Sequence, residues 1–165
     1  MNTTIKLLAS TAIVLAMASA ASAQYSLNLS SSQPTTDPLV IAMMEAEKRI
    51  EERTEGQVEV TVYPSSQLGE DNDVLEQIRN GAPIAALVDA GRLAPFHPAL
   101  GILSAPYLVN DYTEYAAITA SPVYAEWVEE LAEGSALRLL NYNWFQGTRQ
   151  TFTNREINQP SDLSG

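Results

Sequence analysis

The apolar run PIAALV at residues 83–88 constrains the fold more than any other stretch of the chain. A half-exposed strand alternates apolar and polar residues, whereas a strand covered on both faces, as in a parallel sheet, is apolar throughout. Parallel strands need crossover connections, and helical patterns separate this run from two alternating segments at 25–29 and 57–63. The alternation of strands and helices therefore predicts a doubly wound α/β domain.

The helices of this pattern have recognisable boundaries. Asp37 and Pro38 predict the start of the first crossover helix, because Asp is a favoured N-cap and Pro has no N–H to lose at the first helical position. A second helix has the spacing of a face that packs on a core, formed by Tyr124, Trp127, Val128 and Leu131. The remaining elements are expected at 69–80, 112–120 and 122–133 as helices and at 137–145 as a strand.

Residues 1–23 have the features of a secretory signal peptide. Lys6 supplies a positive start, and the apolar run at 7–18 is shorter than the roughly 20 residues that cross a bilayer. Ala21-Ser22-Ala23 forms a cleavage site, so we expect the mature chain to begin at Gln24 and not to insert directly into a membrane. The chain contains no cysteine, which excludes disulfides and thiolate metal sites.

The mature chain is strongly acidic. Without Lys6, eight Lys and Arg residues stand against twenty Asp and Glu residues, a net charge of −12. Such a surface repels nucleic acid and anionic lipid headgroups, so neither is an expected partner. It does not exclude an anionic small molecule, because a ligand in a cleft responds to nearby arginines more than to distant, screened charge.

Polar residues follow the predicted strands at the edge where α/β sheets bind ligands, outside the carboxyl ends of the strands. The three loops at this edge are 30–36, 64–71 and 89–92. Asp89 and Arg92 come directly after the apolar run. They can contact a polar ligand, form a salt bridge with each other, or do both, since an Asp can hold an Arg in place for a ligand carboxylate.

Two further residues are candidates for ligand binding. Asp71 lies in the second of these loops, whereas its neighbours Glu70 and Asp73 fit the first turn of a helix, where acidic residues complement the helix dipole. Arg149 follows the last predicted strand and Gly147, and its guanidinium offers a rigid fork for a carboxylate. The residues alone slightly favour an ordinary surface arginine at this position.

The chain shows no signature of a catalytic centre. It has no nucleophile elbow, phosphate loop or metal-ligand cluster, and its single histidine, His97, has no second imidazole to pair with. No cofactor and no metal are therefore expected. The alternative that stays open is a secreted enzyme acting on acidic sugars, in which Asp71 and Asp89 would do acid–base work.

Three stretches resemble the DctP-type solute receptors of tripartite ATP-independent periplasmic (TRAP) transporters, in the order and spacing of that family. They are YPSSQLGEDNDVLEQIRNGAP, ALVDAGRLAPFHPALGILSAPYLVNDY and FQGTRQTFTNREINQPSDLSG. The resemblance implies a receptor that is located in the periplasm and has a periplasmic binding protein-like fold, with two lobes and a hinge. Such a receptor closes on an organic acid and hands it to a membrane permease driven by an ion gradient, and it is not an enzyme.

The same resemblance implies how the chain divides. Residues 24–146 are expected to form most of lobe one, and residues 147–165 the hinge crossing near Gly147 and the start of lobe two. The chain is thus expected to be the N-terminal half of a receptor. Because closure needs contacts from both lobes, we expect these 165 residues alone to bind no ligand with useful affinity.

Within the family, the likeness to sialic acid receptors rests on SSQLG followed by two acidic residues, a carboxylate-x-x-Arg after the third strand, and GTRQT. It implies ligand-binding roles for Asp71, Asp89, Arg92 and Arg149. Ser32 stands where those receptors have an asparagine near the ligand, and Asp89 is one methylene shorter than the usual glutamate. These differences leave room for another sugar acid or a C4-dicarboxylate.

Overall fold

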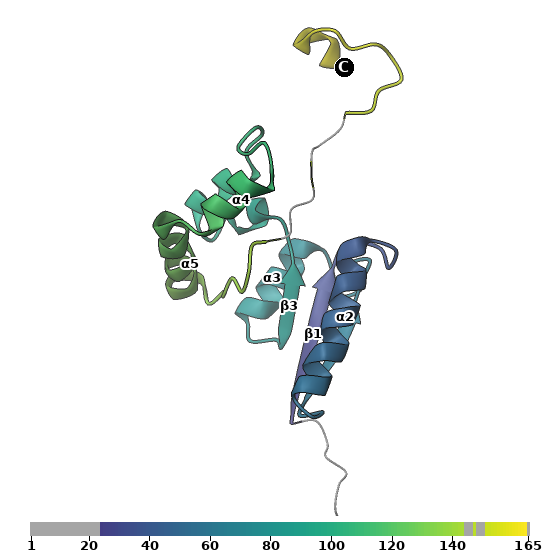
Figure 1. Ribbon diagram of the computed structural model, residues 1–165, viewed down its shortest axis with the longest axis vertical. Helices are drawn as coiled ribbons and strands as arrows, with labels where there is room; N and C mark the ends of the chain where they lie inside the picture. Colours follow the sequence, from purple (N-terminus) through teal and green to yellow (C-terminus); the bar gives the residue numbers. More distant parts are fainter. Residues whose placement is uncertain (1–23, 144–146, 148–150, 165) are drawn as a thin grey trace, which may run out of the picture.

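The computed structural model describes residues 24–143, 147 and 151–164, and the structural statements below concern these residues. A three-stranded parallel sheet of order β2-β1-β3 lies at the centre, as Figure 1 shows. The predicted α/β class with a parallel sheet is confirmed. The strands are β1 Tyr25–Ser31, β2 Val58–Tyr63 and β3 Ile84–Leu87.

The three strands end side by side. Ser30 of the central strand pairs with Tyr63 of β2, and Ser31 pairs with Leu87 of β3. The carboxyl ends, where the arrowheads of β1 and β3 lie in Figure 1, therefore form one edge of the sheet. The loops that leave this edge are the three that the sequence predicts to bind a ligand.

The two crossover helices cover opposite faces of the sheet (Figure 1). Helix α2, Pro38–Arg53, packs on β2, and helix α3, Asp71–Arg79, packs on β3. Asp37 is the N-cap of α2 as predicted, and its carboxylate accepts a hydrogen bond of 2.8 Å from the Leu39 N–H. Helix α3 begins at Asp71, two residues later than predicted. The Asp71 carboxylate therefore lies at the junction of the loop and the helix.

Between α2 and the sheet lies one part of the core. Val40 and Met43 of α2 and Val60 of β2 are buried. The outer strand β2 is also secured at its edge, because the Val60 N–H donates a hydrogen bond of 3.1 Å to the Glu51 carboxylate of α2. This bond satisfies a backbone donor that an edge strand otherwise leaves to water.

A leucine cluster forms the second part of the core and joins α3 to the elements that follow β3. These elements are two short 3-10 helices, η1 Ala90–Leu93 and η2 Pro98–Ser104, and the helices α4 Tyr112–Thr119 and α5 Pro122–Ser135. Trp127 of α5 packs against the cluster, and Leu131 lies inside it, which confirms the predicted core-facing stripe. The cluster consists of Leu75, Leu93, Leu100, Leu131 and Leu137.

The structure corrects the prediction of a strand at 137–145. No strand is present over 137–143, the part of this segment that the structure describes. The segment does alternate, with Leu137 buried and Leu140 77% exposed, but it packs on the leucine cluster and pairs with no strand of the sheet. An alternating pattern indicates which side chains face the core. It does not indicate whether another strand lies beside the segment to pair with it.

The burial of β3 also differs from the prediction. Every residue of Ile84–Leu87 is only partly buried, although the run is apolar throughout. β3 is an outer strand in the order β2-β1-β3, and α2 packs on β2 at the other side of the sheet. The apolar run therefore carries more hydrophobic surface than the described residues cover.

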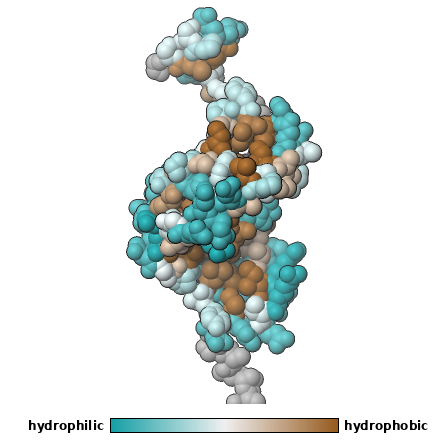
Figure 2. Space-filling view, turned by 90° about the vertical axis from the view of Figure 1, so that its left-hand side faces the viewer, coloured by the Kyte–Doolittle hydropathy of each residue, from teal (hydrophilic) through white to brown (hydrophobic). Residues whose placement is uncertain are grey.

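Apolar surface is visible elsewhere too. On the face shown in Figure 2, apolar side chains gather in more than one area, with hydrophilic side chains between them. Ile102 and Val123 are each 50% exposed. Surfaces of this kind are typical of faces that pack against further protein. None of the helices formed by the described residues is both long and apolar enough to cross a membrane.

Candidate functional site

Main-chain hydrogen bonds hold together the loops after β1 and β2. The Ser66 N–H donates to the Ser31 carbonyl at 3.1 Å, and the Ser65 N–H donates to the Gln33 carbonyl at 2.8 Å. Both Ser65 and Ser66 have φ of 55°, a left-handed conformation that few residues other than glycine adopt. The two loops thus form one unit at the carboxyl edge of the sheet, and the second of them leads into Asp71.

Asp71 and Arg92 meet across this edge. The Arg92 Nε lies 3.6 Å from the Asp71 Oδ2, although 20 positions of the sequence separate the residues. The Asp71 side chain is 18% exposed and that of Arg92 50% exposed. The separation exceeds that of a normal hydrogen bond, so the pair is an electrostatic contact with room for a ligand group or a water molecule beside it.

The expected alternative of a salt bridge between Asp89 and Arg92 is absent from the described residues. No ion pair joins their side chains, and the interaction between them is a main-chain hydrogen bond of 2.9 Å from the Arg92 N–H to the Asp89 carbonyl. Within the described part of the chain, the Asp89 side chain is exposed and makes neither a hydrogen bond nor an ion pair. The Asp89 carboxylate is therefore free to accept hydrogen bonds from a ligand.

Ser104 fixes the short helix η1 that carries Arg92. The Ser104 Oγ accepts a hydrogen bond of 2.8 Å from the Gly91 N–H. A Cβ atom at Gly91 would lie 3.1 Å from the same oxygen, which is tighter than ordinary contact. A glycine at this position allows the close approach of η1 to the last residue of η2. This approach fixes the backbone from which the Arg92 side chain extends.

Ser32 and Arg149 complete the set of predicted ligand-binding residues. Ser32 follows Ser31, which pairs with Leu87, so Ser32 lies at the same edge of the sheet as Asp89 and is partly buried. Arg149 lies outside the described residues, so its predicted role stays a prediction. Gly147, at the predicted hinge, has φ of 79°, which glycine adopts without strain.

A tyrosine cluster beside Asp89 escaped the sequence-based prediction. The ring of Tyr142 lies 5.3 Å from that of Tyr115 and 6.3 Å from that of Tyr124, measured between centroids. The Tyr142 hydroxyl donates a long hydrogen bond of 3.4 Å to the Leu103 carbonyl. Four of the seven tyrosines fall within residues 112–142, and this concentration was the available signal.

These phenols stay neutral at physiological pH. Burial raises the pKa of Tyr142, and the negative charge of Asp89 raises the pKa of Tyr142 further. Burial is also the main cause that raises the pKa of Tyr115 and the pKa of Tyr124. The charge of Asp89 thus links the tyrosine cluster electrostatically to the candidate site.

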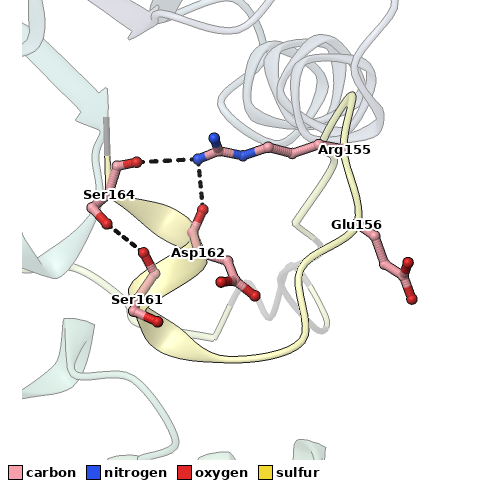
Figure 3. Close-up of a pocket in the computed structure, with 5 residues that line it drawn as sticks. All are labelled: Arg155, Glu156, Ser161, Asp162 and Ser164. Carbon is pink, nitrogen blue, oxygen red and sulfur yellow. Dashed lines mark hydrogen bonds between the residues drawn. The ribbon is translucent and has the colours of Figure 1, made fainter.

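Two hollows of the described residues do not include the charged residues of the edge. One, of about 380 Å³, has Tyr124, Leu139 and Tyr142 in its wall. The other, of about 300 Å³, lies in the segment 151–164, around the 3-10 helix η3 Pro160–Leu163 (Figure 3). There the Arg155 guanidinium donates to the carbonyls of Asp162 and Ser164 at 2.6 and 3.2 Å, so its charge is already used in holding this turn together.

His97 has a structural contact. Its Nε2 lies 2.7 Å from the Glu130 carboxylate of α5, and this contact ties the turn before η2 to that helix. Among the described residues, its Nδ1 is buried without a hydrogen-bond partner. Within the described part of the chain, no group of three or more His, Cys, Asp or Glu residues has the arrangement of a metal site.

A parallel α/β domain with carboxylates and an arginine gathered at the carboxyl edge of its sheet is a domain suited to binding a polar small molecule. Comparison with known proteins identifies the family. Residues 29–165 match the DctP family, described as bacterial extracellular solute-binding protein, family 7. The chain belongs to this family, whose members are solute receptors rather than enzymes, and the predicted resemblance is confirmed.

Individual relatives agree with this assignment. The chain is 38% identical to a TRAP periplasmic solute-binding protein of Escherichia fergusonii in an apo open structure, with a TM-score of 0.75 over 84% of this chain and 46% of that chain. It is 30% identical to a TRAP solute-binding protein of Ochrobacterium anthropi with bound L-fuconate, with a TM-score of 0.63 over 66% of this chain and 36% of that chain. It is 28% identical to the sialic acid-binding periplasmic protein SiaP of Vibrio cholerae over 70% of this chain and 36% of the relative. The chain thus spans less than half the length of these relatives.

Proposed function

We propose that this protein is the periplasmic solute receptor of a TRAP transporter and captures an organic acid for uptake. In this role it delivers the acid to the membrane permease subunits, which use an ion gradient. The observation that carries the proposal is the convergence of Asp71, Asp89 and Arg92 at the carboxyl edge of the sheet, in a chain of the solute-receptor family. The L-fuconate bound by the Ochrobacterium anthropi relative is an acid of the proposed kind.

The candidate residues divide the work by chemistry. Arg149 pairs with the carboxylate of the ligand, because a guanidinium forms two parallel charged hydrogen bonds to that group. Asp71 and Asp89 accept hydrogen bonds from ligand hydroxyl or amide groups. Arg92, held near Asp71, extends its remaining donors to the ligand, and Ser32 adds a hydroxyl at the same edge.

The proposal also includes a hinge and a destination. Residues 24–146 form lobe one, and the chain crosses to lobe two near Gly147, whose left-handed conformation suits a sharp change of direction. Closure of the lobes brings Arg149 against a ligand that already rests on the edge of lobe one. The proposed signal peptide at 1–23 directs the receptor to the periplasm.

The replacement Arg149→Ala tests the proposal. In the mature receptor expressed from its complete gene, we expect it to weaken binding of an organic acid by about 2–5 kcal/mol, because a charged pair in a closed cleft is lost. Isothermal titration calorimetry with a panel of L-fuconate, L-gulonate, N-acetylneuraminate and succinate measures the effect. The matched control is Arg138→Ala, an exposed arginine that makes no hydrogen bond or ion pair with the described residues. Unchanged affinity in Arg149→Ala would remove Arg149 from the site, and a wild-type receptor that binds none of these acids would refute the proposed function.

A further inference from the structure

The charges at the carboxyl edge of lobe one are unequal. Arg92 faces Asp71, so the charge of this arginine is already opposed by a carboxylate that is only 18% exposed. Asp89 has no such partner among the described residues. The three side chains therefore leave one uncompensated negative charge, and it lies on Asp89, an exposed hydrogen-bond acceptor.

The described group that responds to the charge of Asp89 is itself neutral. This group is Tyr142, a neutral phenol, because burial and the charge of Asp89 both raise the pKa of Tyr142. The Tyr142 hydroxyl is directed to the Leu103 carbonyl, and its ring packs against that of Tyr115. The described groups that are tied to Asp89 thus offer it no free positive charge, because Tyr142 is neutral and Arg92, bonded to Asp89 only through the main chain, faces Asp71.

From this charge distribution we infer that the edge recognises hydroxyl groups, and that the ligand is a polyhydroxylated monocarboxylate rather than a C4-dicarboxylate. The inference rests on the proposed function and narrows its ligand class. A hydroxyl donates a charge-assisted hydrogen bond to Asp89. A second carboxylate at the same place would face a like charge, and such a pair is repulsive.

The physical reason is the difference between a donor and an acceptor. The carboxylate of Asp89 can only accept hydrogen bonds, and the two carboxylates of succinate at neutral pH can only accept them as well. Arg92 does not offset this mismatch, since its attraction for a ligand carboxylate is reduced by Asp71 at 3.6 Å. A sugar acid avoids the conflict because it presents hydroxyls to lobe one and its single carboxylate to cations elsewhere in the receptor.

The test compares L-gulonate with succinate by calorimetric titration of the mature receptor expressed from its complete gene. We expect the wild type to bind L-gulonate at least about tenfold more tightly than succinate. Asp89→Asn, which keeps the shape of the side chain, is expected to weaken L-gulonate binding by about tenfold or more, because the hydrogen bond loses its charge. The same replacement should leave succinate binding unchanged or strengthen it.

The control is Glu52→Gln, which removes an exposed carboxylate in the last turn of α2, at the opposite edge of the sheet, and should change neither affinity. Two results would overturn the inference while leaving the receptor function intact. One is a wild type that prefers succinate, and the other is an Asp89→Asn receptor that loses both acids equally. Failure to bind either acid, N-acetylneuraminate or L-fuconate would overturn the proposed function together with the inference.

Discussion

Replacing Asp71 and Arg92 separately and together distinguishes a structural ion pair from a pair that serves a ligand. At 3.6 Å, two unit charges attract each other by about 1 kcal/mol at the dielectric constant of water. The Arg92 side chain is 50% exposed, and the contact is longer than a hydrogen bond, so screening and lost side-chain entropy reduce this value. We therefore expect the pair to contribute on the order of 0.5 kcal/mol to the free energy of unfolding.

The assay is a double-mutant cycle with Asp71→Asn and Arg92→Gln, measured by urea unfolding of the mature receptor. The same four proteins are titrated with L-gulonate, for which each single replacement should weaken binding by about tenfold or more. The exposed pair Glu45 and Arg49, 3.0 Å apart on α2, provides the matched control. Its cycle should show a similarly small coupling in unfolding and no effect on binding.

The two measurements can disagree with this reasoning in a clear way. A coupling above about 2 kcal/mol in unfolding would mean that the contact behaves as a desolvated, structural pair. Combined with unchanged affinity for L-gulonate, that result would refute the assignment of Asp71 and Arg92 to the site. A small coupling with a large loss of affinity is the result that the exposure of Arg92 predicts.

Two further predictions concern the core and the tyrosine cluster. Leu131→Ala should lower the free energy of unfolding by about 2–5 kcal/mol, because Leu131 is 1% exposed in the leucine cluster and its loss leaves a cavity. In the same urea experiment, the control Leu140→Ala should lower the free energy of unfolding by less than about 0.5 kcal/mol, because Leu140 is 77% exposed. Stability should also fall as the pH rises above about 10, because the raised pKa of Tyr142 keeps the folded state protonated while tyrosines of the unfolded state ionise near that pH. The stabilisation is thus fully present below about pH 10 and is lost above it. Urea unfolding across this range should show a smaller decline of the free energy of unfolding in Tyr142→Phe than in the wild type. The control Tyr107→Phe, which replaces a fully exposed tyrosine, should show the same decline as the wild type. An identical decline in wild type and Tyr142→Phe would contradict this assignment.

Local signals predicted the elements well. Asp37 and Pro38 marked the start of α2 correctly because capping depends on a few adjacent residues. The end of α5 was less well predicted, since the helix was expected to end at residue 133, before Gly134. The structure carries the helix to Ser135 and places Ala136 in the left-handed position, with φ of 59°. A helix end held by tertiary packing, as Leu137 holds this one, does not have to coincide with a glycine.

Pairings between distant segments were not predictable in the same way. The apolar run of β3 indicated a sheet strand, but its position at the outside of the order β2-β1-β3 depends on the whole topology. The sequence placed Asp71 and Arg92 in two loops of one edge. The short spacing between Asp89 and Arg92, however, raised the alternative of a salt bridge between those two residues. Only the packing of η1 beside the start of α3 brings Asp71 within 3.6 Å of Arg92.

The carboxyl edge separates the contacts that maintain the loops from the groups available to a ligand. A main-chain hydrogen bond from the Ser66 N–H to the Ser31 carbonyl and a hydrogen bond from the Gly91 N–H to the Ser104 hydroxyl fix the loops without using the charged side chains. Asp89 is left unpaired and Arg92 only weakly paired within the described residues. Because these carboxylate and guanidinium groups carry little of the stability, they can exchange water for a ligand at small cost to the fold. A receptor that binds and releases its solute repeatedly requires such a division, since each cycle must change the ligand contacts without disturbing the loops that hold them.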